Sequence, residues 1–263
     1  MDPLMGMGLV ILGSKDILNR LLGPSAGYLG GELKDIFQKC NINLDSIFEK
    51  ATKKLGNKME EKGMVSPRVL KDVINEGRFC EDELTSEYYG GILASSRTAT
   101  GRDDRGVSHL AVLRNLSTYQ IRLHYLFYFL VYRLFKNSDL NIGMDEDRRK
   151  MRIHIPYSTY NAAMEFSKDE DAMYVLSHCI NGFIRHDLLD DDYYWYGGIE
   201  HMRKRLPGAT EGGMIFEPTA YGAELFLWAQ GLSDKTHRNI MKPNVDLGNP
   251  LIRIIEGATK FGK

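Results

Sequence analysis

Charged residues of both signs crowd one short segment of this 263-residue chain, at positions 102–105, between Gly101 and Gly106. Arginine binds carboxylates and phosphates through paired N–H donors, so such a segment could hold an anion or dock an acidic partner. The same residue types are also common in solvated connections between helices. The predicted docking or anion-binding residues are Arg97, Arg102, Asp103, Asp104 and Arg105.

A second polar group joins a histidine to several aspartates, at His186, Asp187 and positions 190–192. Histidine and carboxylates are ligands in metal-dependent hydrolases and nucleases, so a hidden activity that uses His186 is one alternative function. Adjacent aspartates, however, point in different directions on a helix or a strand, whereas a metal ion needs converging donors. We therefore predict no metal site.

The other residues capable of catalysis lack a recognisable catalytic pattern. His124 lies in an apolar stretch, where a core histidine satisfied by hydrogen bonds is more common than a general base. The chain has no G-x-G-x-x-G motif and no G-x-x-x-x-G-K-[ST] motif. Cys40, Cys80 and Cys179 form no C-x-x-C pair and fit a reducing cytoplasm. We predict no catalytic residue and no cofactor.

Basic residues gather in one later run, Arg203, Lys204 and Arg205, with Arg185 upstream. The following segments, MIFEP and TAYGAELFLWA, resemble a wing strand and a capped helix of a winged-helix unit, a fold that often binds DNA. The aspartates at 187 and 190–192 would repel phosphates, and the formal net charge of -1 provides no general attraction to nucleic acid. DNA binding through these four basic residues is therefore an alternative function, and a solvated helix face is the plainer interpretation.

Helix signals dominate the first half of the chain. Apolar residues recur with helical spacing over 44–55, Ser66-Pro67 begins a second helix that ends at Gly77, and an acidic start predicts a third over 81–95. Ser117 and Gln120 form a capping box ahead of an apolar stretch that ends at Phe135. A further helical pattern runs from Gly23 to Phe37.

The small residues of the helix over 81–95 are Gly90, Gly91 and Ala94. Residues of this size allow the backbone of a second helix to approach closely. We predict that the second helix is the aromatic one that begins near Leu116, and that the charged segment lies at one end of this pair.

The pattern changes near residue 137. RIHIPY and MIFEP predict short strands, and helices are predicted over 168–185, around HMRKRLPG, and from Thr219 onward. We predict an apolar leader over 1–22, a helical domain over 23–136 and a C-terminal region over 137–263. The predicted fold class is mainly α, a helical bundle with a smaller α+β, winged-helix-like, C-terminal region.

The beginning of the chain is apolar and uncharged over residues 3–13. This run is shorter than the roughly 20 residues that cross a bilayer, and it lacks the basic region and cleavage site of an export signal. A leader that docks on the core is the favoured interpretation. Membrane contact or disruption through residues 1–20 is a further alternative.

Several of these segments carry a family resemblance. They are NRLLGPSAGYLGGELKD, EKATKKLG, VSPRVLKDVINEG, DELTSEYYGGILASS and LRNLSTYQIRLHY, with ELFLWAQGL nearer the C-terminus. Together they resemble the abortive-infection alpha (Abi-alpha) family of bacterial proteins. The resemblance covers roughly residues 20–132 and is weakest over 186–198.

The resemblance implies a predominantly helical cytoplasmic protein that is linked to defence against phage. It assigns no catalytic residue. The predicted function is non-enzymatic antiviral defence, by recognition of a phage or host protein or by a change of assembly state, and a homo-oligomer is expected.

Overall fold

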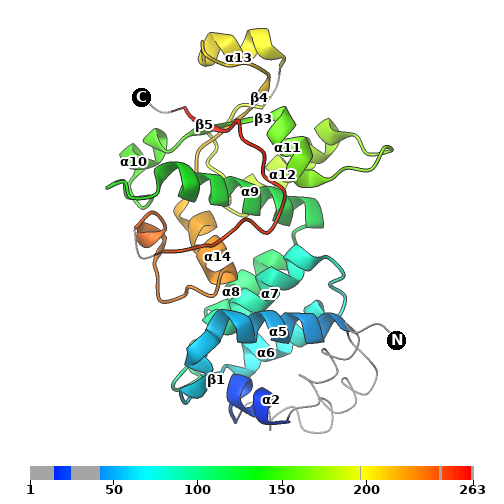
Figure 1. Ribbon diagram of the computed structural model, residues 1–263, viewed down its shortest axis with the longest axis vertical. Coiled ribbons are helices and arrows are strands. Elements are labelled where there is room, and N and C mark those ends of the chain that lie inside the picture. Colours follow the sequence, from blue (N-terminus) through cyan, green and yellow to red (C-terminus); the bar gives the residue numbers. More distant parts are fainter. Residues whose placement is uncertain (1–14, 25–41, 196, 243–244, 262–263) are drawn as a thin grey trace. The chain divides into compact units, whose positions relative to one another are not determined.

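The structure is a computed structural model that describes residues 15–24, 42–195, 197–242 and 245–261. It is mainly helical with a small content of antiparallel strand, which confirms the predicted fold class (Figure 1). The chain forms two compact units, of which the first contains the described residues up to Asn115 and Trp228–Asp234. The second contains Leu116–Leu227 and the described residues from Lys235 onward. The apolar run 3–13 and most of the helix predicted from Gly23 lie outside the described residues.

The first unit is built from helices and one short strand pair. Its elements are α2 (Lys15–Leu22), α5 (Ile42–Leu55), the 3-10 helix η1 (Gly56–Glu60), β1 (Met64–Val65), α6 (Pro67–Gly77), α7 (Glu83–Ser95), β2 (Arg97–Thr98) and α8 (Gly106–Leu113). Strands β1 and β2 are antiparallel, with Met64 opposite Thr98. Helix α7 packs along α5 and also contacts α6 and α8.

Local signals in the sequence set the helix ends of this unit. Pro67 occupies the start of α6, and Asp82 accepts a hydrogen bond of 2.8 Å from the Thr85 N–H at the start of α7. Gly56, with a φ of +50°, follows the last residue of α5. The helices predicted over 44–55, 66–77 and 81–95 are thus confirmed. Helix α8 has no side-chain cap, and the sequence pattern does not predict it.

Two adjacent glycines let α7 approach other backbones closely. A Cβ atom on Gly90 would lie 2.9 Å from the carbonyl oxygen of Ile47 in α5. A Cβ atom on Gly91 would overlap the carbonyl group of Ala229, in the part of the chain that completes the first unit. The close approach at the two glycines is confirmed, and the partners there are α5 and Ala229. The pattern shows which residues are small and not what lies opposite them.

The second unit combines helices with a small sheet. Its elements are α9 (Thr118–Phe135), α10 (Asp145–Lys150), β3 (Ile153–Pro156), α11 (Tyr157–Met164), α12 (Ala172–Arg185), α13 (Ile199–Arg205), β4 (Gly213–Phe216), the 3-10 helix η2 (His237–Asn239) and β5 (Thr259–Lys260). Helix α14 (Ala220–Ala229) belongs to this unit as far as Leu227.

Helix α9 is the centre of the second unit. The predicted capping box is present, since Gln120 donates its backbone N–H to the Ser117 hydroxyl and accepts the Ser117 N–H on its side chain. Most α9 side chains are buried, and the helix packs against α11 and α12. The compact units therefore divide at Asn115, whereas the sequence suggested a boundary at 136, because α9 shares its core with the chain that follows it.

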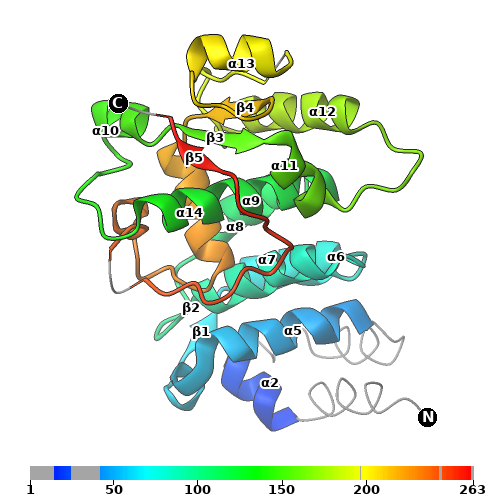
Figure 2. The ribbon, with the colours of Figure 1, turned by 45° about the horizontal axis from the view of Figure 1, so that its top comes forward.

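The sheet of the second unit has the strand order β4-β3-β5, all antiparallel (Figure 2). Ile155 of β3 lies opposite Met214 of β4, and the backbone of Tyr194 pairs with Ile215 on the other edge of β4. The strands predicted from RIHIPY and MIFEP are both confirmed.

Membrane contact through residues 1–20 was one alternative to a leader that docks on the core, and residues 1–14 of that segment lie outside the described part of the chain. In the part that is described, no helix has both the length and the apolar character needed to cross a bilayer. Contact with a membrane surface through the N-terminal residues stays a prediction.

Candidate interaction surface

Arg97 is held inside the first unit by backbone oxygens. Its guanidinium donates hydrogen bonds to the carbonyl groups of Arg20, Lys58 and Glu61, at distances between 2.6 and 3.1 Å. A Cβ atom on Gly63 would lie within 3 Å of the Arg97 guanidinium, so only glycine leaves room for it there. The structure thus gives Arg97 a structural role that joins α2, η1 and β2, in place of the anion-facing role that was predicted.

Replacing Arg97 with lysine is expected to lower the free energy of unfolding of the first unit by about 2 kcal/mol, because one ammonium group cannot reach three carbonyl groups. Hydrogen exchange resolved by segment should show faster exchange over residues 15–22. The matched control is Arg102→Lys, at an exposed position for which no ion pair is found within the described ranges. Equal exchange in wild type and Arg97→Lys would contradict the structural role.

The other charged side chains of the predicted docking segment form ion pairs with one another or with a side chain of a neighbouring helix. Arg105 forms an ion pair of 2.6 Å with Asp103, and this hydrogen bond holds the pKa of the Asp103 carboxyl below its ordinary value. Asp104 pairs with Arg68 of α6, also at 2.6 Å. The Arg105 guanidinium lies 5.2 Å from the ring centre of Trp228. Apart from Arg102, the segment is therefore occupied by its own contacts.

The acidic segment after α12 is also explained by local contacts. Asp187 has a φ of +54°, and Asp190 accepts a hydrogen bond from the backbone N–H of Asp192. The Asp192 carboxylate pairs with Arg152, while His186 is the C-cap residue that follows α12. Within the described ranges no three histidine, cysteine or acidic side chains are grouped to hold a metal ion. The hydrolase alternative thus gains no support from the arrangement of these residues.

His124 and two cysteines lie in the protein interior. The His124 ring is fully buried, and its Nε2 atom lies 3.1 Å from the carbonyl oxygen of Gly222. Burial lowers the pKa of His124 to about 3, so the ring is neutral at physiological pH. Cys80 and Cys179 are free and buried, and Cys40 lies outside the described residues. The expectation of a satisfied core histidine is confirmed.

The basic run predicted for nucleic acid lies on α13, between Tyr194 and β4. Arg203 pairs with Glu200 at 3.2 Å and donates to the carbonyl oxygen of Ala209. The guanidinium of Arg205 lies 4.2 Å from the ring centre of Tyr194. Lys204 is exposed, and Arg185 is exposed at the end of a different helix, α12. Two of the four basic residues therefore already have contacts within the protein.

Helix α12 exposes apolar side chains on one face. Tyr174 is 79% exposed, and Met173 and Ile184 are each 37% exposed. The adjoining face is buried through Leu176, Cys179, Ile180 and Phe183. At 100° per residue, the three exposed side chains fall within an arc of about 100°, and Ile184 lies about 15 Å along the helix axis from Tyr174. The exposed face of α12 is therefore partly apolar.

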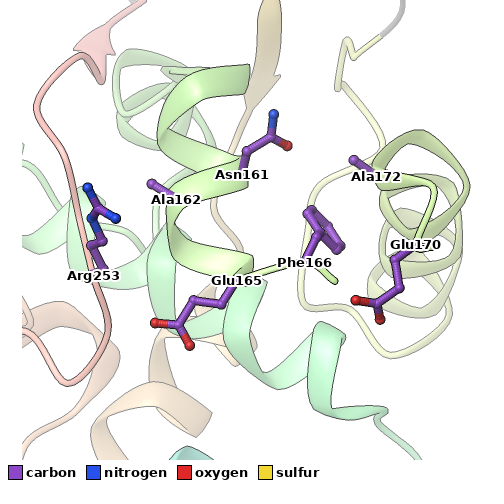
Figure 3. A pocket seen from close by; sticks show the side chains of 7 residues that line it. All are labelled: Asn161, Ala162, Glu165, Phe166, Glu170, Ala172 and Arg253. Atoms are coloured by element: carbon purple, nitrogen blue, oxygen red, sulfur yellow. The ribbon is translucent and has the colours of Figure 1, made fainter. Parts of the chain in front are cut away.

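A pocket of about 410 Å³ adjoins the first turn of α12. Figure 3 shows Arg253 on one side of α11, and Phe166, Glu170 and Ala172 on the other. Glu165, at the end of α11, pairs with Arg122 at 2.7 Å. We call the exposed side chains Met173, Tyr174 and Ile184, together with this pocket, the α12 surface.

The sequence pattern contains a signal for the α12 surface. The helix over 168–185 was predicted, and its apolar stripe is Leu176, Ile180 and Phe183. Tyr174 lies outside this stripe, on a face that does not pack on the core of the unit. An aromatic residue on such a face either contacts a partner or is exposed to water. The pocket has no such signal, because Arg253 reaches it from a segment that is distant in the chain.

Three comparisons complete the description of the site. No family model matches the chain, no curated protein matches it, and no solved structure matches it. The function of the α12 surface is therefore argued from the residues of this chain.

Proposed function

We propose that the protein is a non-enzymatic recognition protein that binds a protein partner through the α12 surface, and that it acts in bacterial antiviral defence. One observation carries the recognition role. Of the six large apolar side chains that are clearly exposed in the described part of the chain, three lie on α12. Apolar side chains that are exposed along one helix are typical of protein contact sites.

The order of elements around α12 supports the same role. α9, β3, α11 and α12 are followed by the Tyr194 pairing, α13 and β4. This order resembles a winged-helix unit, in which α11 and α12 would be the helix pair and α12 the second helix. The second helix of such a pair is the one that contacts the macromolecular partner.

The biological setting comes from the resemblance to the Abi-alpha family. A defence protein of this kind would meet its phage or host partner in the cytoplasm, where the free thiols of Cys80 and Cys179 stay reduced. Binding of a partner or a second copy of the chain at α12 would then change the assembly state.

The proposal is tested by plaque counts on bacteria that express the full chain. Wild type is expected to reduce plaque formation, and Tyr174→Asp is expected to abolish that protection, because a charge replaces the most exposed aromatic side chain of α12. Phe79→Asp is the matched control, since Phe79 is 73% exposed in the first unit and should tolerate the change. Protection by Tyr174→Asp at the wild-type level would reject the role of α12. Failure of the wild type to protect would reject the defence setting.

DNA binding is a second candidate, favoured by the basic residues of α13 and by the order of elements. Against it, three acidic residues lie near the start of α12, and their negative charge repels phosphates. They are Glu165, Glu170 and Asp171. Retention of the full chain on DNA at low salt, lost in an Arg203→Gln, Lys204→Gln and Arg205→Gln triple variant, would favour this candidate. No retention of the wild type would leave protein recognition as the function of α12, and equal retention of both proteins would move DNA contact away from α13.

A further inference from the structure

The pocket of the α12 surface has charged side chains of opposite sign at its two ends, Glu170 and Arg253. Glu170 accepts a hydrogen bond from the backbone N–H of Ser167, and Arg253 is exposed. Over the described ranges of the chain, neither side chain forms an ion pair. Glu165 differs, because Arg122 already neutralises it. The pocket therefore offers one free negative charge and one free positive charge.

Apolar side chains also line the pocket. They are Ala162, Phe166 and Ala172, all partly buried. The Phe166 ring is supported from within by Tyr119 and Tyr160, whose ring centres lie 6.1 and 5.5 Å away. An aromatic ring that is fixed in this way can pack against the alkyl part of a lysine or arginine and attract its charge.

We propose that this pocket binds a short peptide segment of the partner, with a lysine or arginine at the Glu170 end and an acidic side chain at the Arg253 end. The proposal rests on the recognition function above and adds the chemistry of the partner. The basic side chain would lie on Phe166 with its charge at the Glu170 carboxylate. Arg253 would bind the acidic side chain through its paired N–H donors. The exposed Tyr174 ring, two residues beyond Ala172, would extend the contact along α12.

Charge complementarity distinguishes this occupant from other ligands. A nucleic acid carries only negative charge, and it would place phosphates beside Glu165 and Glu170. A purely apolar helix would leave Glu170 and Arg253 covered and unpaired, at a cost in desolvation. A peptide segment that carries both charges satisfies both ends of the pocket.

The test is selection from a displayed library of random heptapeptides on the full-length wild-type protein, followed by titration calorimetry with one enriched peptide. Enriched sequences are expected to contain a basic and an acidic residue at a constant spacing. Glu170→Gln and Arg253→Gln should each weaken that peptide about fivefold, and together about 25-fold. Asp169→Gln is the matched control, because Asp169 is exposed but does not line the pocket.

A charge swap makes the orientation testable. The double variant Glu170→Arg with Arg253→Glu should restore binding to a peptide whose two charged residues are exchanged. The proposal is overturned if no peptide is enriched, if the enriched peptides lack the charge pair, or if Glu170→Gln and Arg253→Gln bind as tightly as the wild type. Loss of phage protection in Tyr174→Asp with full protection in the Glu170→Gln, Arg253→Gln double variant would reject this inference alone and leave the recognition function standing.

Discussion

Replacing Gly91 with alanine is expected to lower the free energy of unfolding of the first unit by about 3 kcal/mol or more, a large effect for the addition of one methyl group. The new Cβ atom would overlap the carbonyl group of Ala229. A backbone group cannot rotate away as a flexible side chain can, so α7 would have to separate from the segment that covers it. Ser95 would then lose its hydrogen bond of 2.9 Å to the carbonyl oxygen of Trp228.

Denaturant unfolding followed by circular dichroism, together with hydrogen exchange over residues 83–95, measures this effect. The matched control is Gly208→Ala, because a Cβ atom at Gly208 would meet no atom within 4 Å. The control should unfold like the wild type. A Gly91→Ala protein as stable as the wild type would show that Ala229 does not pack on α7.

The second large effect is expected from Arg152→Met. Arg152 donates a hydrogen bond of 2.6 Å to Glu217, whose side chain is only 4% exposed. Removal of the guanidinium leaves a buried carboxylate without its charged partner, which costs about 3 kcal/mol at neutral pH. The matched control is Asp192→Asn, which removes the more exposed partner of the same arginine and should cost little.

The pH dependence of this variant follows from Glu217. Burial raises the pKa of the Glu217 carboxyl, and Arg152 opposes that rise. Without Arg152 the pKa should be higher still, so the folded protein would hold its proton to a higher pH than the unfolded chain. The destabilisation of Arg152→Met should be small below the ordinary carboxyl pKa of 4.5 and should grow as the pH rises through the raised value. Unfolding curves between pH 4 and 8 that show a constant difference would contradict this account.

Much of the fold follows from local sequence signals. Helices α6, α7 and α9 begin at a proline, an aspartate and a serine, which are helix-start signals that can be recognised in the sequence. Strands β3 and β4 coincide with the predicted apolar segments. Helix α10 is missed because its sequence, DEDRRK, has no apolar stripe. The boundary between the units is missed because α9 is joined to its neighbours by tertiary packing, and such packing produces no recognisable pattern in the local sequence.

The candidate sites show a similar limit. The arginines and aspartates of the charged segment are conspicuous in the sequence, yet their partners are Arg68, Trp228 and three backbone carbonyl groups. Backbone acceptors are present at every residue, so no residue type reveals that Arg97 binds them. The pocket of the α12 surface likewise combines Glu170 with Arg253, which come together only in the folded unit.

Trp228–Asp234, the segment that completes the first unit, limits when this unit can fold during synthesis on the ribosome. Ser95 and Trp228, which are hydrogen-bonded in the first unit, are 133 residues apart in the sequence. Because a chain emerges from its N-terminus, helix α7 is made long before the segment that covers Gly91. The second unit must be almost wholly translated before the first can close, so a nascent chain arrested before Trp228 would present the uncovered glycine face of α7 to chaperones and proteases.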